Sequence, residues 1–156
     1  MNKKAFTMIE LIFVIIILGV LAAIALPKFA GVSEQAVISN GHSDVMAIRT
    51  AISTERQKRL MQGSSTYISA LDKNVSVTGQ LPSGSLIFDD NDTNKNNGTI
   101  LTYAITTKDS DGGWMRTATN TYKYKVSGIA NTFTYDPNTG IFDCTGGEQF
   151  CTQLTK

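Results

Sequence analysis

Residues 6–26 read FTMIELIFVIIILGVLAAIAL, and this stretch decides how the rest of the chain is interpreted. Only Thr7 and Glu10 interrupt its apolar character. As a helix rising about 1.5 Å per residue it spans roughly 30 Å, which is enough to cross a bilayer. Lys3 and Lys4 precede it. Because positive residues tend to stay in the cytoplasm, we expect a single-pass membrane protein with a short cytoplasmic N-terminus and an extracytoplasmic remainder.

Two general membrane signals compete for this stretch. A plain signal anchor would keep the helix, whereas a secretory signal would be cleaved after Ala23-Ile24-Ala25, which has the A-x-A form. The apolar run before that site is longer than a usual signal core, and Glu10 lies inside it. An ionised carboxylate is costly to place in hydrocarbon, and neither signal has a use for it. Glu10 therefore needs another explanation.

The segment from Lys3 to Phe29 (KKAFTMIELIFVIIILGVLAAIALPKF) closely resembles the N-terminus of type IV prepilins and type II secretion pseudopilins. It combines a basic leader, a small residue, a phenylalanine, a carboxylate at fixed spacing and an apolar helix. The resemblance implies that a prepilin peptidase/methyltransferase removes the basic leader 1–5 by cutting between Ala5 and Phe6, and then N-methylates Phe6. Family leaders usually end in Gly, so we expect Ala5 to be accepted with reduced efficiency.

Cleavage would give Glu10 a partner in a filament. The new α-amino group of Phe6 would be largely protonated at neutral pH. In a helical stack of subunits, Glu10 of one chain can meet the Phe6 ammonium of its neighbour, which removes an unpaired charge from hydrocarbon. Glu10 and Phe6 are therefore the predicted assembly residues. The alternative is that Glu10 lies near the headgroups and is solvated.

Pro27 follows the apolar run. Proline removes a helical hydrogen bond and clashes with the preceding turn, so we expect a kink there, with a simple helix stop as the alternative. Residues 27–62 then read as an amphipathic continuation of the helix that ends near Gly63. Together the two segments would form a helix about 80 Å long. Its apolar positions recur at spacings of three and four: Val37, Gly41, Val45, Ile48 and Ile52.

Residues 63–156 are predicted to form a globular head. Alternating runs at 121–126, 132–135 and 141–144 suit antiparallel strands. Residues 136–140 read DPNTG, a turn that would join the last two strands in a hairpin. A meander laid across the second half of the long helix gives an α+β fold, which is also the architecture that the resemblance to pilins implies.

Cys144 and Cys151 are the two cysteines of the chain. In an extracytoplasmic head they favour a disulfide over free thiols. A bridge across so short a loop contributes about 2.5 kcal/mol on the chain-entropy model. A zinc site is poorly supported, because there is no further Cys and His42 is distant.

Two acidic loops are candidates for calcium. Asp90, Asp92 and Asn94 supply oxygens at alternate positions, but the run departs from an EF-hand loop at later positions. Asp109 and Asp111 form the second candidate. Polar turns with no ion are the alternative for each loop. No cofactor is required by the expected function, and Ca²⁺ is the one candidate.

The net charge of +1 argues neither for nucleic acid nor against it. The basic group Arg56, Lys58 and Arg59 reads as a solvated helix end rather than a nucleic-acid site, so nucleic acid is not indicated as a partner. No nucleophile with a base and no phosphate-binding loop is evident, so we expect no enzyme.

The resemblance implies a structural subunit of a type IV pilus-like filament. The subunit would be either a major-type type II secretion pseudopilin or a small type IV pilin, and the modest head and calcium candidates suit both. Its partners would be further copies of itself, minor pilins or pseudopilins, the processing peptidase, the inner-membrane assembly platform and the lipid bilayer. The subunit would begin in the inner membrane and end in a periplasmic or surface filament. The alternative function is a membrane-tethered or secreted extracytoplasmic binding domain that does not polymerise.

Overall fold

The computed structural model describes residues 6–73, 77–89 and 100–156, and in the range 26–30 it describes the backbone only. The chain divides into two compact units, Met1–Ala36 and Val37–Lys156. Helix α1, Met8–Met61, contributes to both. The helix is continuous across Pro27, so the alternative of a helix stop at that residue is not what the structure has. The kink at Pro27 stays a prediction.

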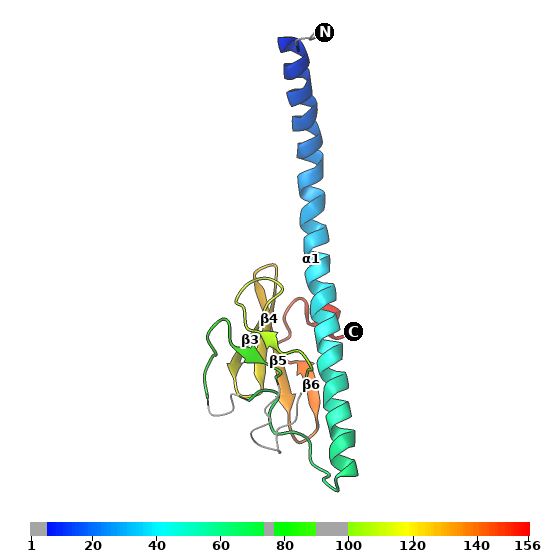
Figure 1. Cartoon of the computed structure of the whole chain (residues 1–156), viewed down its shortest axis with the longest axis vertical. Coiled ribbons are helices and arrows are strands. Elements are labelled where there is room, and N and C mark those ends of the chain that lie inside the picture. The colour runs from blue at the N-terminus through cyan, green and yellow to red at the C-terminus, as the bar shows by residue number, and fades with distance from the viewer. Residues whose placement is uncertain (1–5, 74–76, 90–99) are drawn as a thin grey trace, which may run out of the picture. The chain divides into compact units, whose positions relative to one another are not determined.

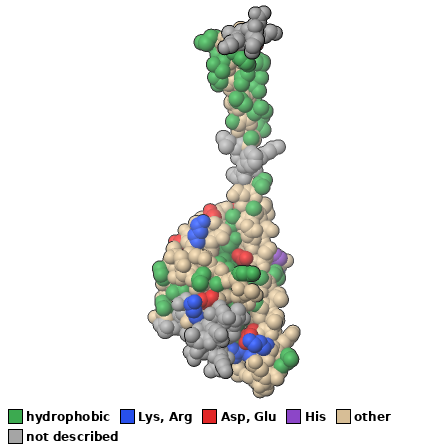
Figure 2. Space-filling view, in the orientation of Figure 1, with side chains coloured by type: hydrophobic (Ala, Val, Ile, Leu, Met, Phe, Trp, Pro, Cys, Tyr) green, Lys and Arg blue, Asp and Glu red, His purple; other side chains and the backbone are tan. Residues whose placement is uncertain are grey.

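The first unit is helical and presents its apolar side chains to the outside. The large hydrophobic residues from Phe6 to Ile24 are between 43% and 82% exposed. Figure 2 shows these apolar side chains crowding the first turns of α1. The segment Met8–Ala25 has a mean hydropathy of 2.9 and is long and apolar enough to cross a membrane. Secretory signal sequences are also long and apolar, so length and hydropathy alone do not distinguish a membrane-spanning helix from a signal sequence.

The second unit combines the later turns of α1 with two antiparallel sheets and a short helix (Figure 1). The larger sheet has the order β3-β4-β5-β6, so it is a meander. The smaller sheet pairs β1 with β2. The elements after α1 are β1 Leu86–Ile87, β2 Ile105–Thr106, β3 Trp114–Ala118, β4 Thr121–Val126, β5 Ile129–Asp136, β6 Ile141–Cys144 and α2 Cys151–Thr155.

The α+β organisation predicted from the sequence is confirmed. Strands β4 and β6 have the predicted bounds, whereas β5 is longer than the predicted 132–135. The hairpin of β5 and β6 turns at 136–140, where Gly140 has φ +73° and its N–H donates to the Asp136 carbonyl at 2.8 Å. Gly63, with φ +82°, follows the end of α1 as predicted.

One face of α1 packs on the larger sheet. Of the predicted apolar positions, Val45, Ile48 and Ile52 are buried. Gly41 is also buried, because the ring of Tyr124 lies against its backbone. The sheet contributes mostly aromatic residues to this core, and they pack ring against ring: Trp114, Tyr122, Tyr124, Phe133 and Phe142.

The interpretation of the helix end as a solvated basic group was wrong for one residue. Arg59 is only 9% exposed, and its Nε lies 3.2 Å from the Glu55 carboxylate, one turn earlier on α1. Arg56 lies over the Tyr67 ring at 4.5 Å. The contact of Arg56 could not be seen in the helical pattern because Tyr67 comes from the segment after α1.

Candidate assembly site

The helix α1 begins with a reciprocal cap made by Thr7 and Glu10. The Thr7 Oγ1 accepts a hydrogen bond from the Glu10 backbone N–H at 3.3 Å. In return, one carboxylate oxygen of Glu10, Oε2, accepts from the Thr7 N–H and from the Thr7 hydroxyl, each at 2.8 Å. This is the capping box T-x-x-E, which satisfies backbone N–H groups that the first turn leaves unpaired.

The role of Thr7 was not predicted from the sequence. The signal was present, because Thr followed three residues later by Glu before an apolar run is a helix-start signature. The cap gives Glu10 a local partner in the single chain. The carboxylate predicted to act between subunits is therefore held at the start of the apolar helix in a defined orientation.

Phe6 is the other predicted assembly residue, and Ala5 and Phe6 are the predicted processing residues. Phe6 is 82% exposed, next to Thr7. Ala5 and the rest of the leader lie outside the described residues. The arrangement can bury apolar helix surface against lipid or against other helices, and it places one carboxylate at the start of that surface.

The predicted disulfide is present. Cys144 at the end of β6 and Cys151 at the start of α2 are bonded, with Cα atoms 5.6 Å apart. The bridge closes a short loop over the end of the sheet. Phe150, which belongs to this loop, is buried.

The structure describes only one of the two calcium candidates. Asp90, Asp92 and Asn94 lie outside the described residues. Asp109 forms an ion pair with Lys125, and the Asp111 carboxylate accepts the Gly128 N–H at 2.7 Å. Within the described ranges, the two carboxylates do not belong to a group of three or more acidic, His or Cys ligands. Calcium binding stays a prediction.

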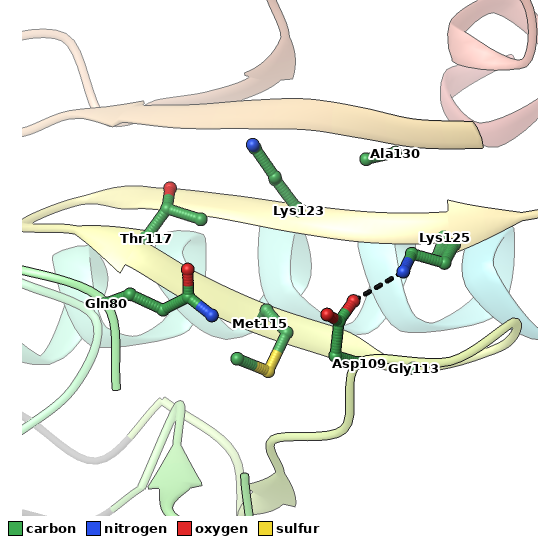
Figure 3. A pocket seen from close by; sticks show the side chains of 8 residues that line it. All are labelled: Gln80, Asp109, Gly113, Met115, Thr117, Lys123, Lys125 and Ala130. Atoms are coloured by element: carbon green, nitrogen blue, oxygen red, sulfur yellow. Dashed lines mark hydrogen bonds and ion pairs between the residues drawn. The ribbon is translucent and has the colours of Figure 1, made fainter. Parts of the chain in front are cut away.

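Asp109 and Lys125 lie at one end of a hollow of about 240 Å³ on the outer side of the larger sheet (Figure 3). Met115 on β3 lies on the same hollow, and Lys123 on β4 stands beside it. Asp109 is the ion-pair partner of Lys125, so a calcium ion at this carboxylate would compete with the lysine ammonium.

The buried charged residues and tyrosines of the head were also not predicted from the sequence. The Trp114 indole N–H donates to Asp44 on α1 at 2.9 Å, and burial raises the pKa of that carboxyl. Burial likewise raises the pKa of Tyr124 to about 12. Two residues after Trp114 on β3, buried Arg116 lies 3.2 Å from buried Asp72. These groups fix α1 and the loop after it to the sheet.

Comparison with known proteins bears on the N-terminal segment. A family model of the prokaryotic N-terminal methylation motif matches residues 1–26. Residues 1–26 therefore carry the prokaryotic N-terminal methylation motif. The resemblance noted for the segment from Lys3 to Phe29 is thereby confirmed. The model covers Ala5, Phe6 and Glu10, although it does not by itself test processing.

Several pilus and fimbrial proteins are similar to part of this chain. The type IV narrow pilus major component PilA5 of Thermus thermophilus is 45% identical over 51 residues, which is 33% of this chain and 44% of that protein. A fimbrial protein of Moraxella nonliquefaciens is 46% identical over 55 residues, 35% of this chain and 36% of that protein. A fimbrial protein of Pseudomonas aeruginosa is 33% identical over 73 residues, 47% of this chain and 45% of that protein.

These matches cover less than half of each relative. No solved structure matches the chain significantly. The long helix followed by small antiparallel sheets is nevertheless the organisation that the prepilin-type segment implied.

Proposed function

We propose that the chain is a structural subunit of a type IV pilus-like filament, anchored in the inner membrane before assembly. The observation that carries the proposal is the exposed apolar surface from Phe6 to Ile24 with Glu10 held at its start. Such a surface needs lipid or other helices around it, because water alone would leave it unfavourably exposed.

Processing is the first step of the proposed mechanism. A prepilin peptidase/methyltransferase cuts between Ala5 and Phe6 and methylates the new amino group. The Phe6 ammonium of one subunit then pairs with Glu10 of its neighbour, while the apolar helices pack together as they leave the bilayer. Removing an unpaired charge from hydrocarbon favours the assembled state.

Among filaments, we favour a surface pilus over a type II secretion pseudopilus. The relatives from Thermus thermophilus, Moraxella nonliquefaciens and Pseudomonas aeruginosa are named as pilus or fimbrial proteins. A pseudopilin remains the second candidate, because the matches cover less than half of this chain and less than half of each relative. Glu10 favours an internal subunit over a tip subunit. Further copies, minor pilins and the assembly platform are its proposed partners.

Two measurements test this function. The first is the mass of the N-terminal peptide from a membrane fraction, which we expect to start at methylated Phe6. A start at Met1 would favour a plain anchor or poor cutting after Ala5, and a start at Leu26 would favour a secreted soluble domain.

The second measurement is the yield of sheared filaments from cells that express Glu10→Gln. We expect filaments to be lost while the amount of subunit in the inner membrane stays at the wild-type level. Glu34→Gln is the matched control, since Glu34 lies on the same helix beyond the apolar stretch. Wild-type filament yield from Glu10→Gln would contradict the proposed pairing of Glu10 with Phe6. An absence of filaments from the wild type itself would support the alternative, a membrane-tethered binding domain that does not polymerise.

A further inference from the structure

Three potential metal ligands converge at the C-terminal loop of the head. The Sγ atoms of Cys144 and Cys151 and a carboxylate oxygen of Glu148 all lie within 4.8 Å of one another. The Glu148 Oε2 lies 3.4 Å from the Cys151 Sγ and 3.9 Å from the Cys144 Sγ. Among the described residues this is the one such group of three.

The separations fit a zinc ion. Tetrahedral zinc bonds thiolate sulfur at about 2.3 Å and carboxylate oxygen at about 2.1 Å, so a sulfur and an oxygen on one ion lie roughly 3.6 Å apart. The two measured separations from Glu148 Oε2, 3.4 and 3.9 Å, lie on either side of that value. On reduction, the sulfurs have only to move apart to about 3.8 Å, the tetrahedral spacing of two thiolates.

Contacts other than the disulfide hold this loop in place. The Thr145 N–H donates to the Thr132 carbonyl at 2.9 Å, which extends the pairing of β6 with β5. The Phe150 N–H donates to the Asn131 side-chain oxygen at 3.2 Å, and both residues are buried. The Cys151 N–H donates to the Glu148 carbonyl at 3.1 Å. The positions of all three ligands are therefore supported when the sulfur–sulfur bond is absent.

Gly146 provides the space that the carboxylate occupies. A Cβ at this position would lie within 2.1 Å of all three atoms of the Glu148 carboxyl group. Gly146 has no side chain, so the carboxylate can fold back over the two sulfurs. An alanine would displace the flexible end of Glu148 without removing it.

We propose that the reduced head binds one Zn²⁺ through the thiolates of Cys144 and Cys151 and the carboxylate of Glu148, with water as fourth ligand. Binding releases the two thiol protons to solvent. Oxidation of the same pair by a disulfide-bearing oxidant transfers two electrons to that oxidant and removes both thiolate ligands. The metal-bound and disulfide forms are thus mutually exclusive. The sequence offered little support for zinc because only Cys and His were considered as ligands, and Glu148 was not.

The test uses the full chain in detergent micelles, reduced with a phosphine and titrated with Co²⁺, followed by displacement with Zn²⁺. We expect thiolate-to-cobalt charge-transfer absorption that saturates at one equivalent and disappears on adding Zn²⁺. Changes outside the ligand set already weaken metal sites about 10–100-fold, so Glu148→Gln should weaken binding at least about tenfold. Gly146→Ala should also weaken it.

Asp109→Asn is the matched control, because Asp109 is a carboxylate of the head that pairs with Lys125 and does not belong to the ligand group; the affinity of this variant for the metal should equal that of the wild type. Oxidised protein should give no charge-transfer band. The proposal is overturned if the reduced wild type shows no stoichiometric band, or if Glu148→Gln binds as tightly as the wild type. It is also overturned if reduction alone abolishes the near-ultraviolet circular dichroism of Trp114, because the ligands would then lack their support.

Discussion

The close contact of Gly41 with the sheet makes Gly41→Ala a sharp test of how α1 packs in the head. A Cβ at Gly41 would lie 2.3 Å from a ring carbon of Tyr124 and 2.7 Å from a methyl group of Leu154. The Tyr124 ring has little freedom to retreat, because its hydroxyl donates to the Val37 carbonyl at 2.7 Å. Overpacking a core of this kind costs about 1–3 kcal/mol.

The higher helix propensity of alanine offsets part of this loss of stability. Replacing glycine by alanine inside a helix stabilises it by about 0.5–1 kcal/mol. The net expectation is a loss of about 1–2 kcal/mol, which lowers Tm by about 4–8 °C for a unit of this size. Gly31→Ala is the matched control, since Gly31 lies on the same helix with nothing within 4 Å of the added Cβ. It should show no loss of stability.

The assay is thermal unfolding followed by the fluorescence of Trp114, whose ring lies 4.9 Å from that of Tyr124. Adding Tyr124→Phe releases the ring from the Val37 carbonyl, so the loss caused by Gly41→Ala should be smaller in that background. A Tm for Gly41→Ala equal to or above that of the wild type would refute the packing described for this helix.

Three further predictions concern charges in the head. Because the pKa of Asp44 is raised in the folded head, its protonation increases the free energy of unfolding as the pH falls towards the ordinary pKa of 3.8. Asp44→Asn should lack this increase when urea unfolding is followed by Trp114 fluorescence at neutral and acidic pH. Arg49 donates to the carbonyls of Phe142 and Thr155, so Arg49→Ala should cost about 1.5–3 kcal/mol in urea unfolding, and Arg49→Lys should not restore it. If the head binds calcium, Ca²⁺ should raise its Tm relative to a chelator; an unchanged Tm at millimolar Ca²⁺ would contradict the prediction.

The sequence was informative where the structure depends on local patterns. The apolar helix, its end at Gly63 and the turn before Gly140 follow from periodicity and from residues that accept positive φ. Strand β3 was missed because Arg116, a charged residue in its middle, is fully buried. Its partner Asp72 comes from a distant loop, so no window of neighbouring residues contains both charges. Strands β1 and β2, two residues each, are too short to show alternation.

The contacts of Glu10 at the start of α1 bear on how this one carboxylate could serve two purposes. Both contacts from Thr7 go to one carboxylate oxygen, Oε2, and within the described part of the chain Oε1 accepts no hydrogen bond. A carboxylate can accept several bonds through its two oxygens. If the proposed pairing forms, the ammonium of a neighbouring Phe6 can therefore approach Oε1 while the helix cap persists. The cap orients the charge before assembly, so pairing between subunits need not break the start of the helix.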